Sequence, residues 1–256
     1  MGHDRVKAEY ERHNEHRARW SGKPVLQVVY SDLYRRIVER LAPGLVVEVG
    51  GGSGNLKEQL SDVLSFDVAW APWLDFVADG QTLPLADASV GNLVMLDVLH
   101  HIEFPRKFLA EAQRVLVDGG RVIMIEPGVT AASWAFYRFV HEEPTIMDAD
   151  PLRDGKPDPG KDPYGGNQAI PTLLFRSPGK IERVCPELYT REVQWLSLFA
   201  YPLSGGFKPW SLITPALAKA VLRAEDRIAP ALGRWLGFRM LAVIEKRTAS
   251  ARRSAA

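Results

Sequence analysis

The fold of this 256-residue chain is decided by the stretch Leu45-Val46-Val47-Glu48-Val49-Gly50-Gly51-Gly52-Ser53-Gly54. Its first half follows a Pro-Gly break and is rich in β-branched residues, which predicts a short, buried parallel strand. Its second half places glycine at alternate positions, where glycine permits positive φ and lets a ligand approach the backbone closely. A turn that binds a nicotinamide dinucleotide would carry its third glycine one position later, where this chain has Asn55. The stretch therefore predicts a first strand followed by a ligand-binding turn of another nucleotide type.

Six more strands and four helices are predicted around this turn. Apolar runs place the strands at 66–69, 76–79, 90–96, 121–126, 189–198 and 239–245, and helical periodicity places the helices at 3–20, 25–41, 104–116 and 214–232. Strands that alternate with helices indicate a doubly wound α/β fold with a mostly parallel seven-stranded sheet, whose ligand lies at the carboxyl ends of the strands. The segment between Asp67 and Phe76 is too short for an ordinary crossover helix. We expect Trp70 or Trp73 to cover the sheet face there, in preference to flanking the ligand.

Three acidic residues stand at the ends of three consecutive predicted strands. Glu48 precedes the glycines and could bind an ammonium group by a charge-assisted hydrogen bond. Asp67, after the second strand, is placed to accept hydrogen bonds from ribose hydroxyls, and Asp79, after the third, from an adenine amino group. Singly, each acid is equally typical of a helix cap or a solvated loop. Together, beside the glycine turn, they predict one nucleoside site.

Composition and charge narrow the class of protein. With 46% hydrophobic and 25% charged residues the chain can bury a sizeable core. A net charge of +1, with no array of basic and aromatic residues, gives no case for nucleic acid as a partner. The single cysteine, Cys185, the charged start of the chain and the lack of an apolar run of about 18 residues favour a cytoplasmic protein without a transmembrane segment. We expect a monomer or a homodimer.

The chain is expected to divide into three parts. Residues 1–41 form a helical cap, residues 42–248 form the ligand-binding domain, and residues 249–256 form a disordered tail. Within the domain, residues 130–210 follow the fifth strand and contain a stretch dense in Pro, Gly and Asp. A loop longer than about 12–15 residues is often a functional lid, and we expect this one to cover the substrate.

Four segments resemble a known family. They are Val47 to Gly54, Asp79-Gly80-Gln81-Thr82-Leu83-Pro84-Leu85, Leu96-Asp97-Val98-Leu99-His100-His101-Ile102, and Val115 to Pro127 with its Gly119-Gly120 turn. Over about residues 42–127 the chain resembles the class I S-adenosylmethionine-dependent methyltransferases. The resemblance implies a Rossmann-like fold, S-adenosyl-L-methionine as cofactor and S-adenosylhomocysteine as product. It places the cofactor contacts at Glu48, Gly50, Gly51, Gly52, Gly54, Asp67, Val68, Asp79, Gly80, Leu96 and Asp97.

The acceptor is expected to be a small molecule, such as one of secondary metabolism. Methyl transfer is an in-line displacement that mainly requires alignment and exclusion of water. If a hydroxyl is methylated, a histidine base would help, and His100 and His101 follow the fourth strand. We favour His101, while either histidine could instead be structural. His141, Tyr164 and Asn167 in the lid are candidate substrate contacts. No zinc-type ligand spacing is visible, so no metal is expected.

Two other functions stay open. A nicotinamide-linked oxidoreductase shares the general fold, although Glu48 and Asn55 speak against it. A non-catalytic cofactor-binding subunit would carry the same turn with a degenerate acceptor site. The atom that is methylated is also open: the residues after the fourth strand lack the (Asn/Asp/Ser)-Pro-Pro-aromatic step typical of amino-methylation of nucleobases, so oxygen or carbon is favoured over nitrogen.

Overall fold

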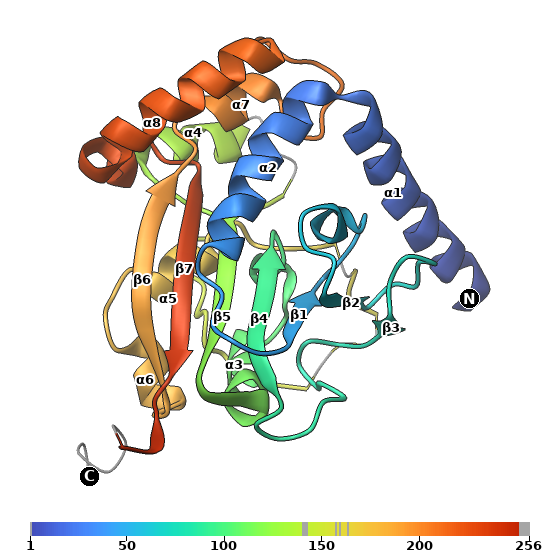
Figure 1. Ribbon diagram of the computed structural model, residues 1–256, viewed down its shortest axis with the longest axis vertical. Helices are drawn as coiled ribbons and strands as arrows, with labels where there is room; N and C mark the ends of the chain where they lie inside the picture. Colours follow the sequence, from blue (N-terminus) through green and yellow to red (C-terminus); the bar gives the residue numbers. More distant parts are fainter. Residues whose placement is uncertain (1, 140–142, 157, 159, 163, 251–256) are drawn as a thin grey trace.

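The computed structural model describes residues 2–139, 143–156, 158, 160–162 and 164–250 (Figure 1). Its sheet contains the strands β1 Val46–Val49, β2 Val63–Asp67, β3 Phe76–Val77, β4 Val90–Leu96, β5 Leu116–Pro127, β6 Leu188–Leu196 and β7 Arg239–Lys246. Their spatial order is β3-β2-β1-β4-β5-β7-β6. Strand β7 is antiparallel to both β5 and β6, and the remaining pairs are parallel. The predicted class, a mostly parallel seven-stranded sheet with helices around it, is confirmed.

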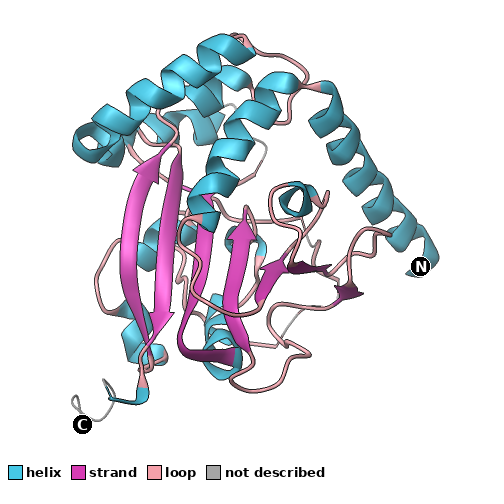
Figure 2. Cartoon of the chain, viewed as in Figure 1, coloured by secondary structure: helices cyan, strands magenta, loops and turns pink. Residues whose placement is uncertain are grey.

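Helices lie on both faces of the sheet (Figure 2). The helices are α1 Gly2–Gly22, α2 Pro24–Val38, α3 Pro105–Val115, α4 Ala131–Phe139, α5 Ile170–Phe175, α6 Lys180–Val184, α7 Ala200–Ser204 and α8 Pro215–Leu236, with the 3-10 turns η1 Asn55–Glu58 and η2 Leu99–His101. None of the described helices is long and apolar enough to cross a membrane.

Alternation along the central strands divides the core into two layers. Val47, Leu93 and Val122 pack in one cluster with the apolar stripe of α3, which includes Phe108 and Leu109. An adjacent residue on each strand, Val46, Val94 and Ile123 in turn, packs in a second cluster with α2 and α8. Because successive side chains of a strand point to opposite faces, a continuous apolar run is what a strand covered on both sides requires.

Several predicted boundaries are wrong. Strand β2 occupies residues 63–67 instead of 66–69, because the Asp67 carboxylate accepts a hydrogen bond from the backbone N–H of Ala69 and turns the chain out of the sheet. Strand β5 begins at Leu116, where we expected a helix end and a turn; the extra residues form an irregularity in the pairing with β4. The near absence of a helix between β2 and β3 is confirmed for the described residues.

The N-terminal helices are bound to the turn at residues 205–210. Lys23, at the corner between α1 and α2, donates hydrogen bonds from Nζ to three backbone carbonyls, those of Gly206 (2.7 Å), Lys208 (2.8 Å) and Trp210 (2.8 Å). Arg19 donates a further bond of 2.6 Å to the carbonyl of Phe207. These bonds join α1, α2 and the 205–210 turn into one wall above the carboxyl ends of the strands.

Candidate active site

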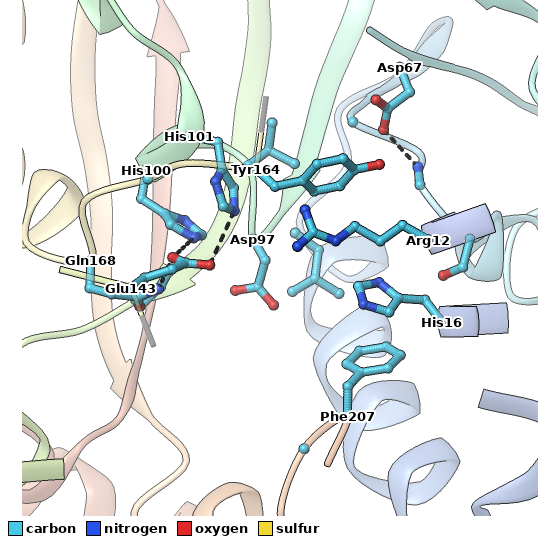
Figure 3. Close-up of a pocket in the computed structure, with 18 of the residues that line it drawn as sticks. Arg12, His16, Asp67, Asp97, His100, His101, Glu143, Tyr164, Gln168 and Phe207 are labelled. Carbon is cyan, nitrogen blue, oxygen red and sulfur yellow. Dashed lines mark hydrogen bonds and ion pairs between the residues drawn. The ribbon is translucent and has the colours of Figure 1, made fainter. Parts of the chain in front are cut away.

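A cavity of about 1220 Å³ lies at the carboxyl ends of β1, β2, β4 and β5, beneath this wall. In Figure 3, His100, His101 and Glu143 gather on one side of it, Arg12, His16 and Phe207 lie on the other, and Asp97 lies between them. The cavity position is the one that the doubly wound topology predicts, because the first crossovers leave the sheet in opposite directions at β1 and β4.

The glycines of the turn after β1 have different reasons to be glycine. Gly50, Gly52 and Gly54 have φ of +73°, +44° and +76°. A Cβ on Gly50 would lie 2.4 Å from Val98, and one on Gly54 would lie 2.6 Å from Trp73, so packing of the turn itself excludes a side chain at these positions. A Cβ on Gly52 would lie in ordinary van der Waals contact, 3.9 Å from both the Gly50 carbonyl oxygen and His13 Nδ1. At Gly52 the positive φ, and not a steric clash, is therefore the reason for glycine.

Glu48 is buried close to the turn. Its side chain is 5% exposed and accepts a hydrogen bond of 2.5 Å from Ser65 Oγ. Burial raises the pKa of Glu48 to about 7. The buried Oδ1 of Asn55, which also lines the cavity, has no hydrogen-bond partner among the described residues. A buried acid with one hydroxyl partner and an unpaired amide oxygen fit a ligand that brings hydrogen-bond donors and a positive charge.

The two aspartates of the predicted nucleoside site differ in their surroundings. Asp67 lines the cavity, and its Oδ2 accepts a 3.0 Å hydrogen bond from the Gly52 N–H, so it holds the glycine turn in place. Its Oδ1 lies 4.0 Å from His13 Nε2. Asp79 is exposed at the rim and accepts a hydrogen bond of 2.8 Å from the Gln81 N–H. Both residues line the cavity, and their contacts with a nucleoside stay a prediction.

Of the remaining predicted cofactor residues, some line the cavity and others do not. Gly51, Val68, Leu96 and Asp97 are among the lining residues, whereas Gly54 and Gly80 are not. Gly80 is packed against β1, where a Cβ would lie 3.2 Å from Val49. Direct contact of Gly54 and Gly80 with the cofactor stays a prediction.

Trp73 was expected to cover the sheet, and this expectation is wrong. Its Nε1 donates a 2.8 Å hydrogen bond to the carbonyl of Gly52, and the Arg17 guanidinium lies 4.7 Å from its ring. Trp70 is 51% exposed and also leaves the core uncovered. Because no crossover helix occupies residues 68–75, this segment can pack against the glycine turn. There the carbonyl of Gly52 accepts the Trp73 hydrogen bond, whereas the carbonyls of a sheet are already bonded within the sheet.

Asp97 forms the floor of the cavity with a partner that the sequence did not suggest. Asp97 has φ of +62°, and its carboxylate is paired with Arg239, the first residue of β7. Arg239 is 2% exposed, and it also donates a 3.2 Å bond to the Tyr30 hydroxyl. Its guanidinium lies 4.1 Å from the ring centre of Tyr201. An arginine at the start of an otherwise apolar strand was the available signal, because a buried cation needs a partner.

His100 is held between two carboxylates. Its Nδ1 is 2.7 Å from Glu126 Oε2 and its Nε2 is 3.4 Å from Glu143 Oε2. Burial opposes the charged ring, but the hydrogen bonds to Glu126 and Glu143 outweigh it and raise the pKa of His100 to about 9. Burial also opposes the charge of Glu143, yet its hydrogen bond to His100 lowers the pKa of Glu143 to about 2. His100 is therefore an imidazolium in an ion-pair network.

His101 has the opposite character. Burial and the adjacent His100 cation lower the pKa of His101 to about 3, so the ring is neutral. Its Nε2 is 4.0 Å from Glu143 Oε1, and its buried Nδ1 has no hydrogen-bond partner among the described residues. The two rings are tilted against one another with their centres 4.0 Å apart.

The three candidate substrate contacts in the lid differ in where they lie. Tyr164 lines the cavity at the Asp67 end, with its hydroxyl 3.4 Å from His13 Nε2 and Arg12 over its ring at 4.2 Å. The Asn167 amide accepts from the Ile146 N–H and donates to the Ile146 carbonyl, and Asn167 is not among the residues that line the cavity, so its contact with substrate stays a prediction. His141 lies outside the described residues.

Only part of the aromatic face of helix α4 lines the cavity. Phe136 and Tyr137 line the cavity, whereas Trp134 and Phe139 are 43% and 75% exposed. Phe207 also lines the cavity, and so do Arg12 and His16 of α1, although neither of these two was predicted to do so. The helical charge pattern of α1 resembles any solvated helix, and only the fold brings that face over the strands.

Comparison with known proteins agrees with this geometry. Residues 47–124 match the family of the methyltransferase domain. A solved S-adenosylmethionine-dependent methyltransferase of Thermotoga maritima, described as a possible histamine N-methyltransferase, is 18% identical with a TM-score of 0.60, covering 94% of this chain and 99% of that one. The [4+2]-cyclase SpnF is 15% identical with a TM-score of 0.53, covering 85% of this chain and 81% of the cyclase.

Curated relatives match over shorter stretches. An uncharacterized protein of Methanocaldococcus jannaschii is 24% identical over 106 residues, which are 38% of this chain and 52% of that protein. An uncharacterized 37.1 kDa transposon protein of Streptomyces fradiae is 47% identical over 51 residues, which are 20% of this chain and 15% of that protein. The chain thus spans about half or less of the length of these relatives.

Residues 47–124 thus match the methyltransferase-domain family, and the chain as a whole has the Rossmann-like fold of the solved S-adenosylmethionine-dependent methyltransferase.

Proposed function

We propose that this chain transfers a methyl group from S-adenosyl-L-methionine to a small-molecule acceptor, on oxygen or carbon in preference to nitrogen. One observation carries the proposal: a single cavity joins the glycine turn and its acids to a second, separate set of polar and aromatic side chains. A protein that only binds a nucleoside needs the first set. The second set supplies a place for an acceptor beside the reactive end of the cofactor.

The cofactor end is assigned from the groups that are free to bind it. Glu48 and Asn55 bind the ammonium end of the methionine moiety, and the backbone at residues 50–52 provides close approach. Asp67 accepts hydrogen bonds from the ribose, and Asp79 lies at the rim for the adenine. Leu96 and Asp97 line the region of the sulfur. The cofactor, when bound, supplies an electrophilic methyl group; the chain aligns the acceptor with it and excludes water.

The acceptor end is assigned to the far wall, where Tyr137, Tyr201 and His101 line the cavity. His100 has both ring nitrogens directed at carboxylates, which argues against a role as general base. The role of His101 as base stays a prediction. Its ring is neutral and has a lone pair, but a pKa of about 3 makes it a weak proton acceptor, so alignment carries more of the rate than proton transfer does.

The preference for oxygen or carbon is supported by Val98-Leu99-His100-His101, which replaces the Pro-Pro-aromatic step of nucleobase amino-methylation. The neutral overall charge supports a small acceptor over nucleic acid. We retain as proposals a cytoplasmic location, a monomer or homodimer, and a cap at residues 1–41 over a catalytic domain at 42–248 that includes the lid. The proposed tail overlaps residues 251–256, which lie outside the described residues.

Calorimetry and a product assay test the proposal. S-adenosylhomocysteine should bind with a stoichiometry of one and NAD should not bind. Incubation of S-adenosylmethionine with a panel of phenols, enols and carboxylic acids should then yield a product heavier by one methylene unit in mass spectrometry. Binding of NAD in place of S-adenosylhomocysteine would overturn the cofactor assignment. Conversion of an acceptor without added methyl, as the cyclase activity of a protein of this fold allows, would overturn methyl transfer.

A further inference from the structure

Two segments far apart in the sequence bring three potential metal ligands together at the acceptor end of the cavity. His100 and His101 come from η2, and Glu143 follows α4. One ligand atom from each lies within 4.8 Å of the other two. Glu143 Oε2 is 3.4 Å from His100 Nε2, and Glu143 Oε1 is 4.0 Å from His101 Nε2. The three donors face one another across a space about the size of an ion.

Glu126 determines which nitrogen of His100 faces this space. Glu126 is fully buried, and its Oε1 accepts the backbone N–H groups of Val98 (2.8 Å) and Leu99 (2.7 Å), so the carboxylate is fixed. Its Oε2 is 2.7 Å from His100 Nδ1 and requires a proton on that nitrogen. Nε2 is thereby directed at Glu143, and the proton that Nε2 carries in the metal-free protein would be released when a cation binds there. A carboxylate behind a histidine is the usual support of a histidine that ligates a metal.

We infer that His100, His101 and Glu143 form a binding site for a divalent cation of the zinc type, with its open coordination position directed into the cavity. Two imidazoles and one carboxylate are the donor set that such ions prefer, and three protein ligands leave a fourth position for substrate. Metal bonds of about 2.0–2.1 Å place tetrahedral ligand atoms roughly 3.4 Å apart. The separations of 3.4 and 4.0 Å to Glu143 need only a small contraction.

The lid backbone packs directly against these ligands. A Cβ on Gly166 would lie 2.8 Å from His101 Nδ1, so only glycine lets the backbone pass this close to the rings. Asn167 N–H donates a 2.9 Å bond to the carbonyl of His100, and Lys161 Nζ donates a 2.7 Å bond to that of His101. Gln168 donates to Glu143 and orients its carboxylate. These contacts fix the lid against the ligands on the side away from the cavity.

The cation would act on the acceptor. An acceptor hydroxyl in the fourth position would be held beside the methyl group, and coordination would lower its pKa so that its proton passes to solvent water. The resulting oxyanion would form the new bond to the methyl carbon as the bond from that carbon to the cofactor sulfur breaks, and His101 would serve as a ligand and not as the proton acceptor. This role rests on the proposed function, whereas binding of the cation does not.

The experiment is metal titration of the full chain after treatment with a chelator. Zn²⁺ should bind with a stoichiometry of one in calorimetry, and Co²⁺ should give the intense visible absorption of a four-coordinate site. His100→Ala and Glu143→Gln should each weaken Zn²⁺ binding at least 100-fold, and Glu126→Gln about 10- to 100-fold. Glu103→Gln and His16→Ala are matched controls, since both residues line the same cavity outside the cluster, and should bind Zn²⁺ normally.

The outcomes separate the inference from the proposed function. Retained binding of S-adenosylhomocysteine by His100→Ala and Glu143→Gln shows that these variants are folded. Absence of stoichiometric Zn²⁺ binding, or equal binding by the wild type and the ligand variants, would overturn the metal site while leaving methyl transfer by the metal-free protein standing. Failure of S-adenosylhomocysteine to bind, with Zn²⁺ binding intact, would instead overturn the proposed function.

Discussion

Replacing Glu48 with glutamine should remove a pH dependence of stability that the wild-type chain carries. Burial raises the pKa of Glu48 from 4.5 to about 7 in the folded protein, so the folded state keeps a proton that the unfolded state loses between these values. The contribution of Glu48 to the stability of the wild type therefore falls as the pH rises through this window and is constant on either side of it. At about 1.4 kcal/mol per pKa unit, the loss from Glu48 alone is about 3 kcal/mol.

Urea denaturation followed by tryptophan fluorescence, at pH values from about 4.5 to 8, measures this effect. The difference in free energy of unfolding between Glu48→Gln and the wild type should shift by about 3 kcal/mol in favour of the variant as the pH rises. Asp62→Asn, an exposed carboxyl near β2, is the control for effects common to any lost acid. A difference that stays constant with pH would refute the reasoning, because it would mean that Glu48 ionises equally in both states.

The same ionisation of Glu48 should determine how tightly the cofactor binds. The carboxylate form of Glu48 binds the ammonium of S-adenosylhomocysteine, so affinity should fall as the pH drops below about 7. Glu48→Gln should weaken binding at least tenfold at high pH and abolish this dependence, as calorimetry would record. Equal affinity of the two proteins at high pH would contradict the assignment of Glu48 to the ammonium.

Three further substitutions test other parts of the site. Gly52→Val should abolish binding of S-adenosylhomocysteine in calorimetry, because it strains a backbone with φ of +44° and fills the space facing His13; intact binding would refute the placement of the ligand. His101→Ala should leave that binding unchanged and slow turnover, and unchanged turnover would remove His101 from the reaction. Lys23→Met should lower the free energy of unfolding by about 2 kcal/mol and increase hydrogen exchange at residues 205–210, since three carbonyls lose a charged donor; unaltered exchange there would show that other contacts hold the turn.

The sequence was informative wherever a function depends on neighbours along the chain. The strand Val46–Val49, the glycine turn and the acids at strand ends follow from local pattern, because parallel strands bring their carboxyl ends to one edge of the sheet. The position of Asp67 at the end of β2 was predicted even though the start of that strand was not. Such features need no knowledge of tertiary packing.

The far wall of the cavity could not be predicted in the same way. Glu143 reaches His100 only because the chain after α4 returns across η2, and Arg239 reaches Asp97 only because β7 is inserted beside β5. The expectation of no metal rested on spacing along the sequence, which cannot detect ligands contributed by distant segments. Trp73 was assigned to the sheet because the carbonyl of Gly52 that holds it becomes available only in the folded turn.

The bonds of Lys23 have a consequence for the rate at which ligands leave. One ammonium group holds three carbonyls of the 205–210 turn, so moving Lys23 breaks all three bonds in a single event. Arg19 still holds the carbonyl of Phe207 at that moment, so the wall opens fully only when both side chains have moved. If product departs past this turn, the lifetime of the complex would be set by two cationic side chains remote from the reacting atoms.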